Sequence, residues 1–345
     1  MRRIIRLLLI VLLCAALAGA WAAWQINAWS QEPFRGFAGD ELFVDIAAGS
    51  SPQAIGRLLA NAGVVHDTFT WRLALERSGE ATRLKAGEYR FTEAATPEQV
   101  IARLVRGDVY LRSITFREGL TIRQMAALYE RAGLGAAADF VRASRQADLI
   151  RDLDPAARDL EGYLFPDTYA LPRRATATDL AAMMVARFAR AWTDDLRREA
   201  ERSGMSPRDL VTLASIIEKE TGRGDERPLV AAVYRNRLQR RMGLQCDPTV
   251  IYALELRGGF DGNLTRADLA IDSPYNTYKY AGLPPGPIAA PGRASLEAAL
   301  RPAPVDYLYF VSRNDGSHAF ASTLDEHNRN VRRYQVEYFR ERGRH

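Results

Sequence analysis

The chain has 345 residues, 47% hydrophobic and 26% charged, which is typical of globular proteins and long enough for two domains. Its formal net charge is +5, but all but three of its 47 Lys and Arg residues are arginines, spread along the chain without a basic block. This pattern argues against nucleic-acid binding. The two cysteines, Cys14 and Cys246, cannot build a disulfide framework, and we expect Cys246 to be buried.

An apolar segment lies near the N-terminus. Residues 7–24 contain no charged side chain, three arginines precede them, and the length suits a membrane-spanning helix. We therefore expect residues 1–24 to form a cytoplasmic stub and a single transmembrane anchor. A cleaved signal peptide is the alternative, because residues 18–20 (AGA) resemble a cleavage site. Residues 25–40 are polar, contain Pro33 and show no periodicity, which predicts a linker.

An internal repeat follows the linker. Residues 43–64 and 114–134 each combine an alternating strand pattern, a Gly, a Ser/Thr helix cap and a periodic helix that ends in Ala-Gly. Residues 86–107 contain a shorter strand–helix unit. We expect residues 41–112 to form a small α+β module with two helices and two or more strands. Its pattern resembles a LysM-like module, a fold known for binding glycans that contain N-acetylglucosamine, although any βα unit shares this pattern.

Residues 113–345 are predicted to form a larger mixed α+β domain, so the fold class is α+β. Residues 161–171 are aromatic and proline-punctuated, which indicates a loop or short strand. Apolar periodicity predicts helices at residues 177–204, 206–222, 226–243 and 295–302, a strand at 306–312 with a hairpin partner at 315–323, and a helical run from Asp325.

Two carboxylates end the helix predicted at residues 206–222. Glu218 and Glu220 fall at opposite margins of its buried stripe, while Lys219 points away from both. A carboxyl beside an apolar wall has a raised pKa, as a general acid near neutral pH requires. Both glutamates are therefore candidate acids, but on different sides of the helix. The alternative is that both simply flank an amphipathic helix.

Two downstream stretches are rich in Pro, Gly, Tyr, Asn and Thr. Residues 243–254 form the first, and residues 272–292 form the second, which has too many Pro and Gly for a helix or regular strand. Such a mixture of aromatic faces and polar partners suits sugar rings, although a loop that only packs the core is equally consistent. The spacing of His318 and His327 is not a metal-binding pattern, and we expect no metal and no cofactor.

Six segments together resemble one known family. ASIIEKETG, ERPLVAAVYRNRL, MGLQCDPTVIYAL, SPYNTYKYAGLPPGPIAAPG, DYLYFVSRNDGSHAFASTLDEHN and the earlier LEGYLFPDTY occur here as in the YceG-like endolytic murein transglycosylases. The resemblance implies a single-pass inner-membrane protein with a cytoplasmic N-terminus and a periplasmic catalytic domain. It implies a lyase that cuts nascent peptidoglycan glycan strands between N-acetylmuramic acid and N-acetylglucosamine, limits strand growth and leaves a 1,6-anhydro end. It also implies that Glu218 is catalytic and that penicillin-binding synthases are partners.

We hypothesise that the sugar groove is lined by seven residues: Gln245, Asp247, Thr249, Tyr275, Asn276, Thr277 and Tyr278. Glu220 would then be structural, paired near Lys219 or with an arginine. Two alternatives stay open at this stage: a muramidase-type hydrolase on the same scaffold, and a non-catalytic peptidoglycan-binding scaffold protein.

Overall fold

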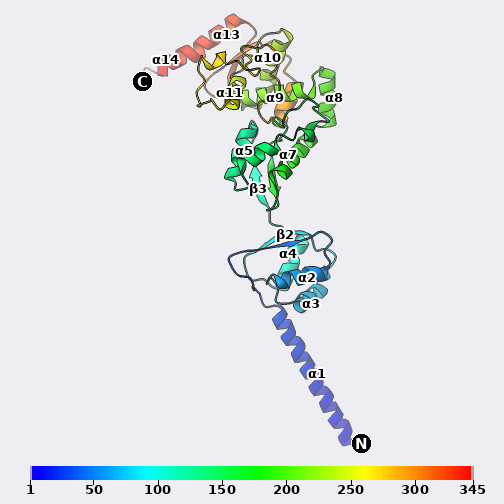
Figure 1. Cartoon of the computed structure of the whole chain (residues 1–345). Helices are drawn as coiled ribbons and strands as arrows, with labels where there is room; N and C mark the ends of the chain where they lie inside the picture. The colour runs from blue at the N-terminus through cyan, green and yellow to red at the C-terminus, as the bar shows by residue number, and fades with distance from the viewer. Residues whose placement is uncertain (1, 343–345) are drawn as a thin grey trace. The chain divides into compact units, whose positions relative to one another are not determined.

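The computed structural model describes residues 2–342, with the side chains of residues 2–8, 22, 23, 26, 30, 341 and 342 left out of the description. The chain divides into two compact units (Figure 1). Unit 1 comprises residues 1–112 together with Pro172–Arg174, and unit 2 comprises Ser113–Leu171 and Ala175–His345.

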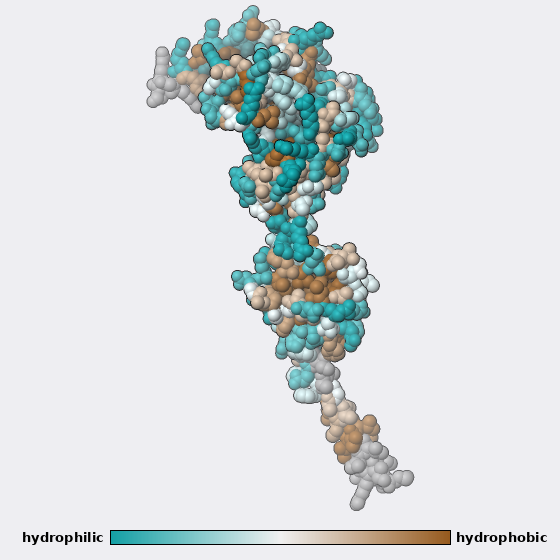
Figure 2. Space-filling view, viewed as in Figure 1, coloured by the Kyte–Doolittle hydropathy of each residue, from teal (hydrophilic) through white to brown (hydrophobic). Residues whose placement is uncertain are grey.

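Unit 1 begins with the helix α1 (Arg2–Ser30), whose side chains at residues 9–21, including Leu9, Leu17 and Trp21, are exposed (Figure 2). The anchor predicted at residues 7–24 lies partly outside the described side chains. Among the side chains that are described, no helix reaches the length and apolarity of a membrane span. The helix also runs through residues 25–30 of the predicted linker, since no Pro or Gly interrupts it before Pro33.

The rest of unit 1 is a small α+β body. In chain order it contains β1 (Leu42–Ile46), α2 (Pro52–Asn61), α3 (Thr68–Ser78), β2 (Gly87–Phe91) and α4 (Pro97–Arg106). The strands β1 and β2 pair antiparallel, with Leu42 opposite Phe91, and their inward residues share one core with Trp71. The module therefore has three helices, where the sequence pattern predicted two. Asp67, which caps α3 through its carboxylate, marks the helix that was missed.

Unit 2 is mainly helical and carries two small sheets. Its strands are β3 (Arg112–Thr115), paired with β4 (Thr168–Leu171), and β5 (Tyr309–Ser312), paired antiparallel with β6 (His318–Ala321). Its α-helices are α5 (Ile122–Arg131), α6 (Ala137–Ala143), α7 (Ala177–Ala191), α8 (Asp194–Ser203), α9 (Pro207–Glu220), α10 (Arg227–Gln239), α11 (Asp247–Leu256), α12 (Arg293–Leu300), α13 (Leu324–Val331) and α14 (Tyr338–Arg342). The short 3-10 helices η1 (Ala147–Ile150) and η2 (Asp268–Ala270) and a π-helical segment, η3 (Arg332–Glu337), complete it. The mixed α+β class is confirmed.

Two predicted helices differ from those observed. The helix expected over residues 177–204 is two helices, because Thr193 leaves the helical conformation and caps α8 by accepting a hydrogen bond from Leu196 N. The helix expected over residues 226–243 ends at Gln239, and Arg241 then adopts a left-handed backbone with φ 56°. Residues 247–256, in the first Pro- and Tyr-containing stretch, form α11. The segment 272–292 contains neither helix nor strand, as predicted.

The centre of unit 2 is α9. Every residue from Leu210 to Ile217 on this helix is buried, and α10, α11 and α12 pack against it. The Ser206 hydroxyl accepts a hydrogen bond from Asp209 N at its start, as the sequence predicted, and Pro207 fits the first turn. A fully buried Leu or Ile side chain contributes about 1.5–3 kcal/mol, so this run anchors the helix firmly. Glu218 and Glu220 thus stand at the end of the most buried helix of the unit.

Candidate active site

The loop at residues 283–292 lies along α9 and is bonded to it at three successive points. Arg208 donates to the Pro285 carbonyl, Ile288 N donates to the Ser215 hydroxyl at 3.0 Å, and Gly292 N donates to Glu218 Oε2 at 2.9 Å. The proline-rich loop is therefore ordered by the polar residues of the helix. The last of these bonds brings the loop to Glu218.

Glu218 is held by charge and by backbone. Its side chain is 5% exposed, and its Oε1 accepts a hydrogen bond from Arg227 Nη2 on α10 at 3.2 Å. Gly292, which donates to the other oxygen, is the N-cap of α12. Arg227 is nearly buried as well, and its Nε has no partner among the described residues. Both carboxylate oxygens of Glu218 are thus engaged by strong donors, which fixes the orientation of the carboxyl group.

A second carboxylate lies at the same guanidinium. Glu118, in the segment between β3 and α5, places its Oε2 3.7 Å from Arg227 Nη2, and its side chain is 47% exposed. Burial and the neighbouring charge of Glu218 raise the pKa of Glu118, and Arg227 partly offsets this rise. The sequence patterns indicated neither Glu118 nor Arg227 as a site residue. Both lie within conspicuous stretches, FREGLT and ERPLV, but no spacing rule connects either stretch to Glu218.

Glu220 faces a different environment from Glu218, as helical geometry predicted. It accepts hydrogen bonds from the Tyr234 hydroxyl at 2.6 Å and from the buried Cys246 thiol at 3.0 Å. Its pairing partners are therefore a phenol and a thiol, in place of the arginine or the Lys219 neighbourhood that we expected. Burial raises the pKa of Glu220, against the lowering effect of these two hydrogen bonds. Burial and the adjacent Glu220 also raise the pKa of the Cys246 thiol.

The seven predicted groove residues divide into three groups. Gln245, Asp247 and Tyr278 line a cavity of about 160 Å³ beside Glu220, where the Tyr278 hydroxyl donates to Asp247 at 2.5 Å. Tyr275 lines a second cavity, of about 130 Å³. Three are buried and braced by the protein itself: Thr249, Asn276 and Thr277. Among the described contacts, none of the seven hydrogen-bonds to Glu218.

The three buried residues hold the loop in place. Asn276 donates from its side-chain amide to the carbonyls of Leu269 and Ile271, at 2.9 and 2.8 Å. The hydroxyls of Thr249 and Thr277 are 2.9 Å apart, and Thr277 also accepts from the Cys246 amide. These bonds tie the segment after η2 to the start of α11, so the cavity beside Glu220 has a fixed wall.

Glu161 is a buried carboxyl that sequence reasoning passed over, although it belongs to the conspicuous segment LEGYLFPDTY. It accepts hydrogen bonds from Ile122 N at the start of α5 and from the Tyr252 hydroxyl, each at 3.2 Å. Burial raises the pKa of Glu161 to about 8. It adjoins a cavity of about 130 Å³ and a second of about 350 Å³. Within the described residues, no three metal-ligating side chains gather in a metal-binding arrangement.

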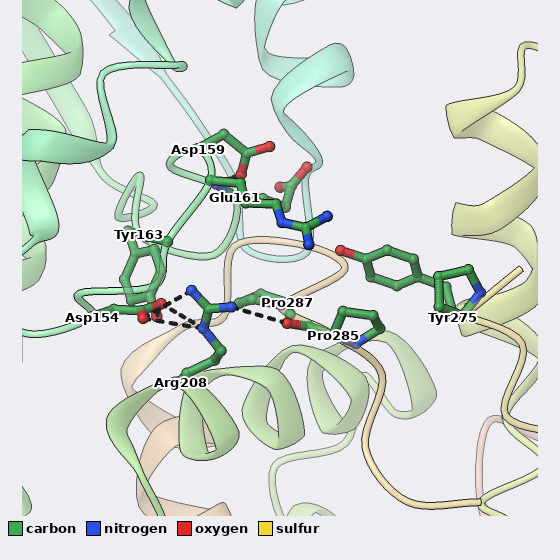
Figure 3. Close-up of a pocket in the computed structure, with 12 residues that line it drawn as sticks. Asp154, Asp159, Glu161, Tyr163, Arg208, Tyr275, Pro285 and Pro287 are labelled. Carbon is green, nitrogen blue, oxygen red and sulfur yellow. Dashed lines mark hydrogen bonds and ion pairs between the residues drawn. The ribbon is translucent and has the colours of Figure 1, made fainter. Parts of the chain in front are cut away.

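Figure 3 shows the smaller of these two cavities. Arg208 forms an ion pair with Asp154 at 2.9 Å, and Tyr163 donates to the same carboxylate at 2.7 Å. Glu161 and Tyr275 lie further along the lining. The ion pair fastens α9 to the segment that carries Glu161, so this wall is rigid.

The fold and the site define an α+β protein with a buried central helix, α9. Glu218 lies near the C-terminal end of this helix, where it is hydrogen-bonded to the Arg227 guanidinium and to the ordered proline-rich loop. The comparisons with known proteins agree: residues 44–333 match the model of the YceG-like family. The chain belongs to this family.

Curated relatives share most of the chain. It is 33% identical to an endolytic murein transglycosylase of Bacillus subtilis, over 84% of each protein. It is 30% identical to an endolytic murein transglycosylase of Streptococcus pneumoniae, over 93% of this chain and 63% of that protein. A crystal structure of a YceG-like protein from Listeria monocytogenes is 32% identical, with a TM-score of 0.58, and covers 85% of this chain and 99% of its own.

Proposed function

We propose that this protein is an endolytic peptidoglycan lytic transglycosylase, a lyase that cuts glycan strands internally. The names of the relatives support the activity, and their identity of 30–33% extends over most of this chain. The observation that carries the proposal is the placement of Glu218. It is a nearly buried carboxyl, oriented by Arg227 and by Gly292 N, at the end of a rigid helix. An acid–base catalyst needs this combination of fixed orientation and restricted solvent.

One carboxyl group suffices for the reaction. Protonated Glu218 gives its proton to the glycosidic oxygen between N-acetylmuramic acid and N-acetylglucosamine, and the bond from C1 to that oxygen breaks. The 2-acetamido group of the muramyl residue stabilises the positive charge at C1. Glu218, now a carboxylate, takes the proton of the C6 hydroxyl, and O6 bonds to C1. No water is consumed, so the product is the 1,6-anhydro end.

The separation of the two glutamates on α9 fits this mechanism. Conventional glycosidases use two carboxyl groups that flank the scissile bond. Here Glu220 is occupied by Tyr234 and Cys246 on the other side of the helix. We assign Glu220 a structural role and Glu218 the catalytic one. The hydrogen bonds of Glu218 to Arg227 and Gly292 must rearrange as the substrate enters, as is common for catalytic groups in unliganded structures.

We further propose that the glycan contacts Gln245, Asp247 and Tyr278, which line the cavity beside Glu220, and Tyr275, which lines a separate cavity. Tyr278 is 38% exposed and offers an aromatic face, and its hydroxyl is paired with Asp247, which suits the faces and edges of a sugar ring. Gln245 has a left-handed backbone with φ 50°, a strained conformation that often accompanies functional sites. Asn276, Thr277 and Thr249 support these walls from within.

The remaining assignments concern the whole chain. We propose an inner-membrane anchor with a cytoplasmic N-terminus in residues 1–24, a LysM-like module in residues 41–112 and a periplasmic catalytic domain in residues 113–345. The order strand–helix–helix–strand from β1 to β2 supports the LysM-like assignment. Nascent glycan strands are the proposed substrate, which makes peptidoglycan synthases of the penicillin-binding class natural partners.

Digestion of purified peptidoglycan, with mass analysis of the fragments, tests the proposal. Wild-type protein should release internal fragments with 1,6-anhydro ends, and Glu218→Gln should release none. Glu130→Gln, on the exposed face of α5, is the matched control and should behave as wild type. Reducing ends in place of anhydro ends would identify a muramidase-type hydrolase. Wild-type activity in Glu218→Gln would show that Glu218 is not the acid, and binding without cleavage by wild type would favour a scaffold protein.

A further inference from the structure

Glu118 and Glu218 share one guanidinium nitrogen. Arg227 Nη2 lies 3.2 Å from Glu218 Oε1 and 3.7 Å from Glu118 Oε2. The two carboxylates come from segments far apart in sequence, and both are within ion-pair distance of the same atom. The positive charge of Arg227 therefore interacts with both carboxylates, and Arg227 is not the counter-ion of either glutamate alone.

The backbone around Glu118 is fixed against the same loop that binds Glu218. Gly119 N donates to the Ala290 carbonyl at 2.8 Å, and Ala290 N donates to the Leu120 carbonyl at 2.9 Å. Gly119 has φ +76°, which favours glycine, and its carbonyl accepts from Lys219 Nζ at 3.2 Å. Glu118 is thus held beside the catalytic helix by backbone hydrogen bonds at the two residues that follow it.

The carboxyl group of Glu118 also lies in space that a side chain at position 292 would fill, and residue 292 is a glycine. A Cβ atom on Gly292 would lie 1.8 Å from Glu118 Oε1, so the absence of a side chain there lets Glu118 approach the start of α12. The N–H of the same Gly292 binds Glu218. Glu118 is therefore brought to the catalytic centre by shape as well as by charge.

The charged groups that face Glu218 come from several elements. Arg227 approaches from α10 and Glu118 from the segment before α5, while Lys219, next in the chain, is directed to Gly119. Arg293 at the start of α12 is paired with Glu297 at 2.7 Å. Arg223 after α9 is paired with Asp225 at 2.9 Å. The electrostatic environment of Glu218 is thus set mainly by one cation, Arg227, and one anion, Glu118.

We propose that Glu118 is a positioning residue for the catalytic acid: its carboxylate shares Arg227 with Glu218 and places a negative charge beside the catalytic carboxyl group. A neighbouring cation favours an ionised carboxyl, and a neighbouring anion favours the protonated one. The pKa of Glu118 itself is raised by its burial and by Glu218, which is consistent with repulsion between the two groups. This inference rests on the proposed function.

The test is the pH dependence of glycan cleavage by the full-length protein, with Glu118→Gln, Glu118→Asp and the control Glu130→Gln beside wild type. In Glu118→Gln the positive charge of Arg227 is unopposed. We expect the basic limb of its profile to move by about one pH unit towards lower pH, with roughly tenfold less activity above that limb and recovery below it. Glu118→Asp keeps the charge and should retain a profile close to that of wild type.

The outcomes separate this inference from the proposed function. If wild type produces anhydro ends and Glu118→Gln has an unshifted profile, the positioning role is wrong and the proposed function stands. An equal loss of activity at every pH, in a variant with wild-type thermal stability, also overturns the positioning role, because it indicates a substrate contact or a structural contact. If wild type cuts no glycan, both proposals fail together.

Discussion

Replacing Glu161 with glutamine is expected to remove a large part of the pH dependence of stability in unit 2. The pKa of this buried carboxyl is about 8, against an ordinary value of 4.5. The folded state therefore binds the proton more tightly than the unfolded state does. Its contribution to stability is fully present below about pH 4.5 and is lost as the pH rises through about 8.

The magnitude follows from the size of the shift. A shift from 4.5 to about 8 implies a loss of about 3.5 kcal/mol between pH 5 and pH 8 if the carboxyl stays dry. Glu161 lines two cavities that are large enough to hold water, and solvent screening there would lower the expected loss to about 2 kcal/mol. Glutamine has the same shape, can still accept from Ile122 N and can donate to the Tyr252 hydroxyl, but it does not titrate.

Urea unfolding of the full-length protein at pH 5, 6, 7 and 8 measures this effect. Wild type should lose about 2 kcal/mol more than Glu161→Gln across the series, which is a relative shift of about 1 M in the urea midpoint of one transition. Glu130→Gln controls for the loss of a surface charge and should follow wild type. Parallel pH dependences in wild type and Glu161→Gln would refute the reasoning, because they would mean that Glu161 has the same proton affinity in both states.

Other substitutions test the supports of the site. Gly162→Ala should lower the free energy of unfolding by about 2–3 kcal/mol, because Gly162 has φ +83° and an added Cβ would lie 2.4 Å from Pro287. Gly259→Ala, where an added Cβ would meet open space, is the control. A Gly162→Ala protein with the melting temperature of wild type would contradict this prediction. Glu220→Ala should lower the free energy of unfolding by about 2–3 kcal/mol, because it leaves the Tyr234 hydroxyl unpaired. Glu220→Gln should keep both the fold and the cleavage activity. A Glu220→Gln protein that is folded but inactive would show that Glu220 takes part in catalysis. Asn276→Ala should lower the free energy of local unfolding by about 1–3 kcal/mol, since it removes two buried hydrogen bonds from the side-chain amide. Proteolytic cleavage between residues 264 and 280 should therefore be faster than in wild type. Cleavage at the wild-type rate would show that these bonds do not hold the loop.

The helices and their ends could be read from local sequence. Ser206, Pro207 and Asp209 predict the start of α9 because the first-turn amides bond to side chains a few residues away. The same logic placed Glu218 and Glu220 on opposite sides of that helix, and their different partners confirm it. Where two local signals competed, the prediction failed: apolar periodicity ran through Trp192, but the Thr193 cap ends one helix and begins the next.

The amino-acid sequence by itself determined the α+β class, the buried helix and the two carboxylates at its end, because helical periodicity and caps depend on residues within one or two turns. Only the tertiary structure decided that Glu118, Arg227 and Glu218 meet, and that Thr249, Asn276 and Thr277 are buried braces. The contacts of Glu118 with Arg227 and of Thr249 with Thr277 join segments that lie far apart in the chain. Their formation depends on how α9, α10 and the loop at residues 283–292 pack together, which no local pattern specifies.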